Sequence, residues 1–326
     1  MSHSKKLHAL GWLSALVFAA NAVHAAELAT EWPSKSVRVI IPYAPGGSAD
    51  LLGRLVGQQL AETFKQNFVS DNRPGATGIV GSELAAKAAP DGYTLLVSGV
   101  GSHVYVPGMM KVPYDPITDF THIALLGGPP GVIVVNGNSA VRDLAGLIAL
   151  AKDKPLSFGS AGTGTSGHLI AERFMQLAKI RMTHIPYKGA GPAVIDVRGG
   201  HIPVATTTLV AAASQIKSGG LRALSISSNT RVKSFPDVPT FTEAGFPVLA
   251  TTWFSLSGPP RMPAPLASRI NQAVRHAMRN SPLRERLSDE AIEANDMDPA
   301  QFTAFMRNEI AVWMPVVKST AAAGAQ

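Results

Sequence analysis

Two glycine-rich segments, each lying between a strand-like run and a helix-like run, most constrain how this chain can fold. The first, YAPGGSAD at 43–50, follows a buried-strand pattern at 36–42. The second, SAGTGTSG at 160–167, follows a strand-like run at 156–159. In both places a helical pattern of apolar residues comes next. Strand-to-helix turns of this kind are typical of α/β sheets, where ligands bind beyond the carboxyl ends of the strands.

Strand-like and helix-like runs alternate along most of the chain, which predicts parallel sheets joined by crossover helices. The segment GGPPG at 127–131 separates two such series, because proline and glycine end strand pairing. The chain returns through 248–256, and its last third is expected to be helical. We therefore predict an α/β protein of two lobes, one formed by 32–126 plus 252–326 and the other by 127–251.

The N-terminus has the layout of a secretory signal peptide. Lys5 and Lys6 form a basic start, an apolar run covers 9–20, and small residues follow as far as Ala25. The apolar run is too short to span a bilayer. We expect residues 1–25 to be a signal peptide cleaved near Ala25, and the mature chain to be exported.

The composition excludes several kinds of site. The chain has no cysteine, which removes disulfides, thiolate metal sites, cysteine nucleophiles and a lipid-modified N-terminal cysteine. Charged residues make up 16% and hydrophobic residues 46% of the chain, a composition typical of a folded globule. The net charge of +7 lies largely in late arginines without a nucleic-acid-binding motif, so we expect a solvated helix face and no nucleic-acid partner.

The two glycine-rich turns have the chemistry of an anion site. Gly46 and Gly47 lack a Cβ, so their backbone can approach a ligand closely. The helix that follows offers unpaired N–H groups and a positive dipole end. The second turn adds the hydroxyls of Ser160, Thr163 and Thr165. The alternative is that both segments are ordinary turns capped by side chains such as Ser48 and Ser166. The occurrence of one turn in each lobe favours the anion site.

A dinucleotide-binding enzyme is the main alternative from another class. Gly162, Gly164 and Gly167 match G-x-G-x-x-G, but this fingerprint requires an acidic residue about twenty positions further on. The next strand ends in Tyr187-Lys188, with no acid. Because a lysine could face a 2′-phosphate, an exported NAD(P)-dependent oxidoreductase that uses the GTGTSG turn remains an open alternative.

Other catalytic patterns are sparse. The sequence has neither a G-x-S-x-G elbow nor a phosphate-binding P-loop, so a hydrolase has little support. His168 and Glu172 stand four residues apart on a helix and could share a metal, but no third ligand is near in sequence. We therefore predict no catalytic residue, no metal and no cofactor. Trp253 could line a cleft or pack at a hinge, and the sequence does not separate these readings.

Along almost its whole mature length the sequence resembles the Bug-type solute-binding receptors of tripartite tricarboxylate transporters (TctC-like). Each matching segment is weak alone, but their order and spacing together are specific. The segments are 42–50 (PYAPGGSAD), 72–78 (NRPGATG), 90–94 (PDGYT), 112–120 (VPYDPITDF), 158–168 (FGSAGTGTSGH), 184–192 (HIPYKGAGP), 221–223 (LRA), 235–245 (FPDVPTFTEAG) and Trp253.

The resemblance implies a periplasmic location and a two-lobed periplasmic-binding-protein fold of the Venus-flytrap type II, with two crossing strands. It implies a monomeric, non-enzymatic receptor that captures a small aromatic or aliphatic mono- or dicarboxylate. The partners would be the integral membrane subunits of the transporter, or a sensor kinase if the protein serves sensing. Such receptors hold the carboxylate mainly through backbone N–H groups, hydroxyls and ordered waters.

The resemblance also implies which residues bind the ligand. One wall would come from the first turn, the other from the second turn, with His168 at the rim and the strand end from Ser98 to Gly101 at the floor. The full set of expected ligand-binding residues is Tyr43, Gly46, Gly47, Ser48, Ser98, Gly101, Ser160, Ala161, Gly162, Thr163, Thr165, His168, Thr207 and Trp253.

Two positions depart from the family pattern. Many relatives carry an asparagine where this chain has Val106, and many carry an aspartate where it has Thr207. The missing carboxylate argues against a ligand with an amine. We therefore expect a distal pocket lined by apolar groups or hydroxyls, suited to an aromatic or plain aliphatic carboxylate.

Overall fold

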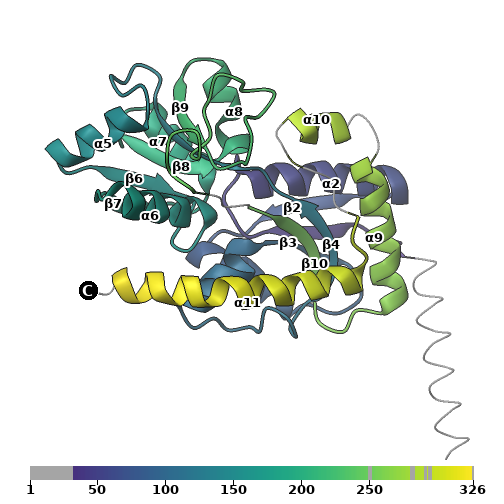
Figure 1. Cartoon of the computed structure of the whole chain (residues 1–326). Helices are drawn as coiled ribbons and strands as arrows, with labels where there is room; N and C mark the ends of the chain where they lie inside the picture. The colour runs from purple at the N-terminus through teal and green to yellow at the C-terminus, as the bar shows by residue number, and fades with distance from the viewer. Residues whose placement is uncertain (1–31, 249–251, 280–282, 290–291, 293–295, 325–326) are drawn as a thin grey trace, which may run out of the picture.

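The strands form two separate five-stranded sheets, which we call the sheets of lobe 1 and lobe 2 (Figure 1). The expected signal peptide at 1–25 and its cleavage position lie outside the residues that the structure describes. No helix among the described residues is both long and apolar enough to span a membrane. The computed structural model describes residues 32–248, 252–279, 283–289, 292 and 296–324.

The sheet of lobe 1 has the strand order β2-β1-β3-β10-β4. Strands β1, β2 and β3 are parallel, and β10 runs antiparallel to both β3 and β4. The strands are β1 (Val37–Ile41), β2 (Phe68–Asn72), β3 (Thr94–Gly99), β4 (Thr121–Gly127) and β10 (Phe254–Gly258). The helices are α2 (Ser48–Phe64), η1 (Ala76–Gly78), α3 (Ile79–Ala86), η2 (Gly101–Tyr105), α4 (Val106–Met109), α9 (Ala264–Arg279), α10 (Leu283–Asp289) and α11 (Pro299–Gly324).

The sheet of lobe 2 has the order β7-β6-β8-β5-β9. Strands β6, β7 and β8 are parallel, and β5 runs antiparallel to β8 and β9. The strands are β5 (Gly131–Asn136), β6 (Ser157–Ser160), β7 (Thr183–Pro186), β8 (Val204–Thr208) and β9 (Leu221–Ile226). The helices are α5 (Leu144–Asp153), α6 (Ser166–Ala178), α7 (Ala190–Arg198) and α8 (Leu209–Lys217).

The two sheets share one plan, and each contains one antiparallel strand that the sequence reading did not anticipate. These strands, β5 and β10, are the ones that the chain reaches directly from the other lobe. Gly131 at the start of β5 pairs with Thr208 at the end of β8, and Phe254 at the start of β10 pairs with Gly99 at the end of β3. A strand arriving from the opposite lobe enters at the carboxyl ends of its neighbours, so it must run against them.

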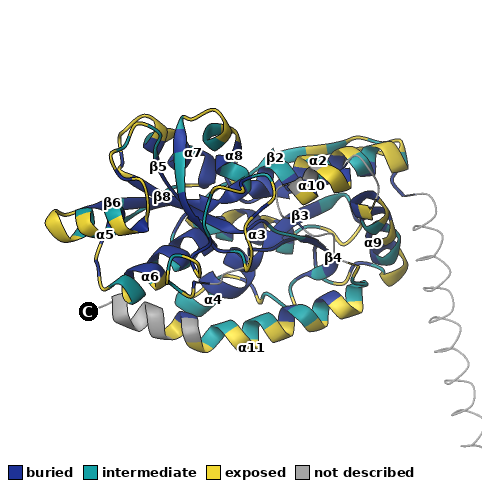
Figure 2. Ribbon diagram, turned by 45° about the horizontal axis from the view of Figure 1, so that its top comes forward, coloured by how far each residue is buried: buried dark blue, intermediate teal, exposed yellow. Residues whose placement is uncertain are grey.

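Both faces of the sheet of lobe 2 are buried, because the side chains of the continuous apolar run in β5 point to both faces. Val132 and Val134 pack with α7 and α8, whereas Ile133 and Val135 pack with α5 and α6. This division follows from the alternation of side chains along a strand. Figure 2 shows the strands buried in the interior and exposed residues on the outer surfaces of the helices.

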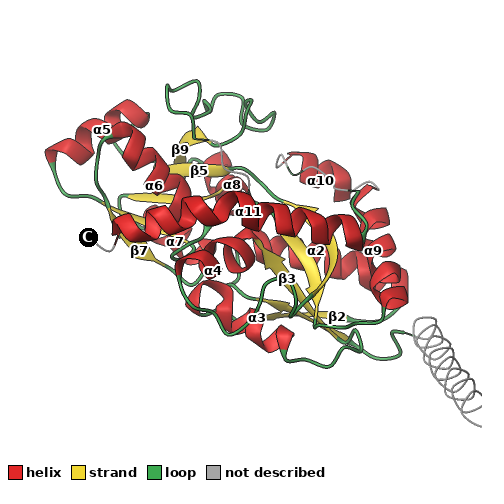
Figure 3. Cartoon of the chain, turned by 60° about the horizontal axis from the view of Figure 1, so that its bottom comes forward, coloured by secondary structure: helices red, strands yellow, loops and turns green. Residues whose placement is uncertain are grey.

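The lobes contact one another along the gap between the sheets. The Ala44 N–H of lobe 1 donates to the Lys188 carbonyl of lobe 2 at 2.8 Å. On another side, α11 runs past both lobes (Figure 3). Its Phe302 and Met306 belong to an apolar cluster against which Leu169 of α6 also packs. The structure therefore shows the two lobes in a closed arrangement.

Candidate ligand-binding site

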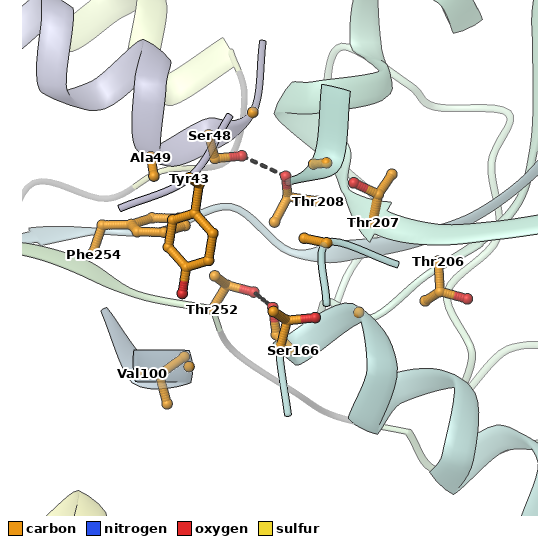
Figure 4. A pocket seen from close by; sticks show the side chains of 16 residues that line it. Tyr43, Ser48, Ala49, Val100, Ser166, Thr206, Thr207, Thr208, Thr252 and Phe254 are labelled. Carbon is orange, nitrogen blue, oxygen red and sulfur yellow. Dashed lines mark hydrogen bonds between the residues drawn. The ribbon is translucent and has the colours of Figure 1, made fainter. Parts of the chain in front are cut away.

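A cavity of about 50 Å³ lies between the lobes, with room for a few water-sized groups (Figure 4). Its polar lining comes from the first residues of helices in both lobes and from the end of β8. Tyr43, Val100 and Phe254 supply an apolar wall. None of the described residues that line this cavity has a charged side chain. Burial raises the pKa of Tyr43, so its phenol is neutral at pH 7.

The N-terminus of α2 reaches the cavity because the turn after β1 is held from behind. Gly46 has a φ of +88°, and its N–H donates to the Asp50 carboxylate at 3.1 Å. Asp50 also accepts from Arg54 and Asn72. Burial alone would raise the pKa of Asp50, but these three hydrogen bonds outweigh it and lower the pKa. Asp50 thus fixes the turn as a carboxylate and does not cap the helix, which leaves Ser48 facing the cavity.

The N-terminus of α6 is organised by hydrogen bonds inside its own turn. The Gly162 carbonyl accepts from the hydroxyls of Ser160 at 3.1 Å and Thr165 at 2.7 Å. It also accepts from the Thr165 N–H at 3.2 Å. Two of the hydroxyls that the sequence suggested as ligand donors, those of Ser160 and Thr165, therefore stabilise the turn. The first residues of the helix, Ser166 and Gly167, line the cavity.

Two further helices begin at the same cavity. Ala190, the first residue of α7, and Thr208, the residue before α8, both line it. Neither helix was expected to contribute. The segment Gly189-Ala-Gly191 after a strand is a glycine signal similar to the other two turns. None of the four helices has a side-chain cap. The Leu209 N–H at the start of α8 donates to the Pro130 carbonyl at 2.8 Å, and the other N–H groups of these first turns are left for a ligand.

Hydroxyl groups surround these helix ends. Ser48 and Thr208 hydrogen-bond to each other across the two lobes, and Thr252 donates to Ser166 at 2.8 Å (Figure 4). Thr206 and Thr207 are 0% and 3% exposed, and their hydroxyls have no partner among the described residues. A buried hydroxyl without a partner costs about 1–3 kcal/mol. A ligand that hydrogen-bonds here would recover part of that cost.

A second cavity of about 350 Å³ adjoins the first. Tyr43 and Ala161 line both spaces. Thr77 of lobe 1 and Gly162 and Thr163 of lobe 2 line only the second. The two cavities therefore share part of their wall, and we call the smaller one the inner cavity and the larger one the outer cavity.

The structure brings most of the expected site residues to these two cavities. Gly46 lies just behind the lining, with its Cα against Gly191 of lobe 2. The expected residues that line the inner cavity are Tyr43, Gly47, Ser48, Gly101, Ala161, Thr165 and Thr207, and those that line the outer one include Gly162 and Thr163.

Besides Gly46, four expected residues do not line either cavity. Ser98 is buried in the sheet, where its hydroxyl contacts those of Ser255 at 2.6 Å and Ser257 at 2.8 Å. The Ser160 hydroxyl is used inside the second turn. Trp253 donates from its indole nitrogen to Glu309 at 2.7 Å and packs in an apolar cluster with Phe302 of α11.

His168 is the fourth, and it lies beneath the second turn instead of at the rim. It is 7% exposed, and its Nδ1 accepts from the Gly164 N–H at 3.1 Å. Its Nε2 is 3.5 Å from Glu172 Oε1. Across the described residues, no three His, Asp or Glu side chains gather as a metal site would require.

Comparisons with known proteins agree with this geometry. A family profile described as "Tripartite tricarboxylate transporter family receptor" matches residues 52–321. Protein BugT of Bordetella pertussis is 33% identical over 312 residues, covering 94% of this chain and 96% of BugT.

Two solved structures superpose over almost their entire length. The periplasmic binding protein BugD matches with a TM-score of 0.84 and 26% identity, covering 89% of this chain and 98% of BugD. MatC from Rhodopseudomonas palustris, solved with bound malate, matches with a TM-score of 0.83 and 30% identity, covering 88% of this chain and 100% of MatC. These matches confirm the predicted two-lobed periplasmic-binding-protein fold, and none supports the oxidoreductase alternative.

Proposed function

Because the chain belongs to the family of tripartite tricarboxylate transporter receptors, we propose that it binds one small organic carboxylate in the cavity between its lobes. The family is one of solute-binding receptors that act in the periplasm. We further propose that this chain is a monomer without enzymatic activity. In this proposal, the closed, loaded form docks to the membrane subunits of a transporter, or to a sensor kinase.

The observation that carries the proposal is the convergence of four uncapped helix N-termini on a cavity without charged side chains. Each helix N-terminus has a positive charge equivalent to roughly half an elementary charge. Four such ends therefore favour an anion in this cavity without a charged side chain. The neutral hydroxyls add hydrogen-bond donors, so a carboxylate can be held without a salt bridge.

Closure follows from the position of these groups. Ser48 belongs to lobe 1, whereas Ser166, Ala190 and Thr208 belong to lobe 2. A carboxylate can contact both sets only when the lobes meet, so its binding selects the closed form. We propose that lobe 1 comprises 32–126 plus 252–326 and lobe 2 comprises 127–251, which is consistent with the membership of the two sheets.

The lining also favours a subclass of carboxylates. Thr207 offers a hydroxyl, and no lining residue offers a carboxylate to pair with an amine. An amino acid would therefore have to bury its ammonium group without a counter-ion, which is costly. MatC was solved with malate, a dicarboxylate without an amine. We propose that this chain takes an aromatic or plain aliphatic carboxylate.

A thermal-shift screen with matched ligands tests this proposal. Succinate and aspartate differ by one amine, and benzoate adds an aromatic carboxylate. We expect succinate or benzoate to raise the unfolding midpoint, because a ligand at a hundred times its Kd stabilises the folded state by about 2.7 kcal/mol. Aspartate, NAD⁺ and NADP⁺ should leave the midpoint unchanged. Stabilisation by aspartate alone would refute the amine argument, and stabilisation by a nucleotide would refute the receptor proposal.

The processing of the N-terminus gives a second test. We propose that the signal peptide is removed near Ala25 and that the mature chain is periplasmic. Protein recovered from the periplasm should begin within a few residues of Ala26, as intact-mass spectrometry and N-terminal sequencing would show. Recovery of a chain that begins at Met1 from that compartment would contradict cleavage.

A further inference from the structure

The hydrogen bond between Gly164 and His168 determines which nitrogen of the neutral imidazole carries the proton. An imidazole nitrogen accepts a hydrogen bond only when it carries no proton. Because Nδ1 accepts from the Gly164 N–H, neutral His168 carries its proton on Nε2. That nitrogen lies 3.5 Å from Glu172 Oε1, and its N–H faces this carboxylate oxygen as an acceptor. The environment on both sides of the ring therefore favours one tautomer.

Two further rings fix the position of His168. The rings of His168 and His184 stack with centroids 4.2 Å apart, and Phe158 stacks on His184 with centroids 4.9 Å apart. The Nε2 of His184 is 2.7 Å from the Ser160 hydroxyl, at the start of the same turn. Burial, followed by the effect of nearby His168, lowers the pKa of His184 to about 4, although Glu172 opposes this. The stack is therefore a rigid support under the turn.

The turn needs this support because its own hydrogen bonds hold Gly162 and not Gly164. The internal bonds converge on the Gly162 carbonyl, whereas the N–H of Gly164 is held by His168. Gly164 has a φ of +78° and lies against lobe 1, where a Cβ would be 3.1 Å from both Met109 and Val106. Two residues later α6 begins with Ser166 and Gly167, which line the cavity.

We propose that His168 is a positioning residue for the ligand-binding turn of lobe 2. Its Nδ1 lone pair holds the Gly164 N–H and thereby sets the direction in which the N–H groups of Ser166 and Gly167 face the cleft. His168 acts on the ligand only through the turn. Its effect on binding rests on the proposed function, whereas its effect on the turn is present in the ligand-free protein.

The test uses two variants that differ in one acceptor atom. In His168→Asn the side-chain Oδ1 can take the place of Nδ1, whereas His168→Phe keeps a stacking ring and has no acceptor. Amide hydrogen exchange by NMR, without ligand, reports on Gly164. The amide of Tyr187, which donates to the Ser160 carbonyl, is an internal reference for global opening. A carbon-13 spectrum of the wild-type imidazole reports the tautomer.

We expect Gly164 to exchange about tenfold faster in His168→Phe, relative to Tyr187, and near the wild-type rate in His168→Asn. The wild-type spectrum should show the Nε2–H tautomer. Unchanged exchange in His168→Phe, equal acceleration in both variants, or the Nδ1–H tautomer would overturn the assignment. Succinate binding, measured by calorimetry, should weaken about tenfold in His168→Phe and recover in His168→Asn. If wild-type protein does not bind succinate, the proposed function fails for that ligand, and the exchange rates still decide the role of His168.

Discussion

Replacing Gly191 with alanine is expected to weaken carboxylate binding about ten- to hundredfold while both lobes stay folded. In the closed structure a Cβ at residue 191 would lie 2.5 Å from the Pro45 carbonyl oxygen and 3.3 Å from the Gly46 Cα, both in lobe 1. These are backbone atoms, so they cannot move aside as a flexible side chain would. Overpacking of this kind costs about 1–3 kcal/mol, and 1.4 kcal/mol is a tenfold change in affinity. This free-energy cost arises only when the lobes close, because the clashing atoms belong to the opposite lobe.

The measurement is calorimetry with a carboxylate found in the thermal-shift screen, together with the unfolding midpoint of the unliganded protein. Gly57→Ala is a matched control, because residue 57 lies inside α2 and its Cβ would make only an ordinary 3.7 Å contact with Phe68. This control should bind as the wild type does. Wild-type affinity in Gly191→Ala would show that binding does not require the closed contact. A large fall in the unfolding midpoint of unliganded Gly191→Ala would show that the substitution disturbs lobe 2 itself and not the contact between the lobes.

Acid is expected to destabilise the protein well above the pH at which carboxylates titrate. His103 and His122 are 0% and 3% exposed. Burial, as the main cause, lowers their pKa values to about 3 and about 4, from an ordinary value of 6.5. Below pH 6.5 the unfolded chain therefore binds more protons than the folded one, so stability falls with the pH. Two such groups remove about 2.7 kcal/mol per pH unit, or about 5 kcal/mol by about pH 4.5.

Chemical denaturation at a series of pH values measures this loss. His184, whose pKa burial lowers to about 4, adds to the effect of His103 and His122. His122→Leu removes one of these three groups, so the decline in unfolding free energy between about pH 6 and about pH 4.5 should become roughly a third less steep. His276→Leu, at an exposed position of α9, is the matched control and should keep the wild-type slope. An unfolding free energy that stays constant over this pH range in the wild type would show that the two imidazoles are accessible to protons.

The sequence was sufficient to predict the elements whose pattern is local. The apolar runs of β1 and β6, the glycine-rich turns after them and the amphipathic helices α2 and α6 lie close to their expected positions. The two glycine-rich turns both contribute to the cavity, as the presence of one such turn in each lobe suggested. These features depend on neighbouring residues, so a single sequence carries most of the required information.

Contacts between distant segments could not be predicted in the same way. The hydroxyls of Ser98 and Ser160 were expected at the ligand, but each contacts a side chain from a distant strand, namely Ser255 and His184. A hydroxyl has the same appearance in a sequence whether it binds a ligand or a carbonyl. The convergence of four helix N-termini on the cavity was also not predicted, because only packing of the folded chain brings the starts of α7 and α8 beside those of α2 and α6.

The order of the strands has a consequence for the order in which the two lobes can fold. β10 lies between β3 and β4, although more than a hundred residues separate it from either in sequence. All five strands of the other sheet come from one uninterrupted stretch between β5 and β9. Because a chain is synthesised from its N-terminus, the sheet of lobe 2 can assemble while the sheet of lobe 1 still lacks the strand that joins β3 to β4. The strands β1 to β4, which are synthesised first, are thus among the last to be covered in a complete sheet, because that sheet requires β10.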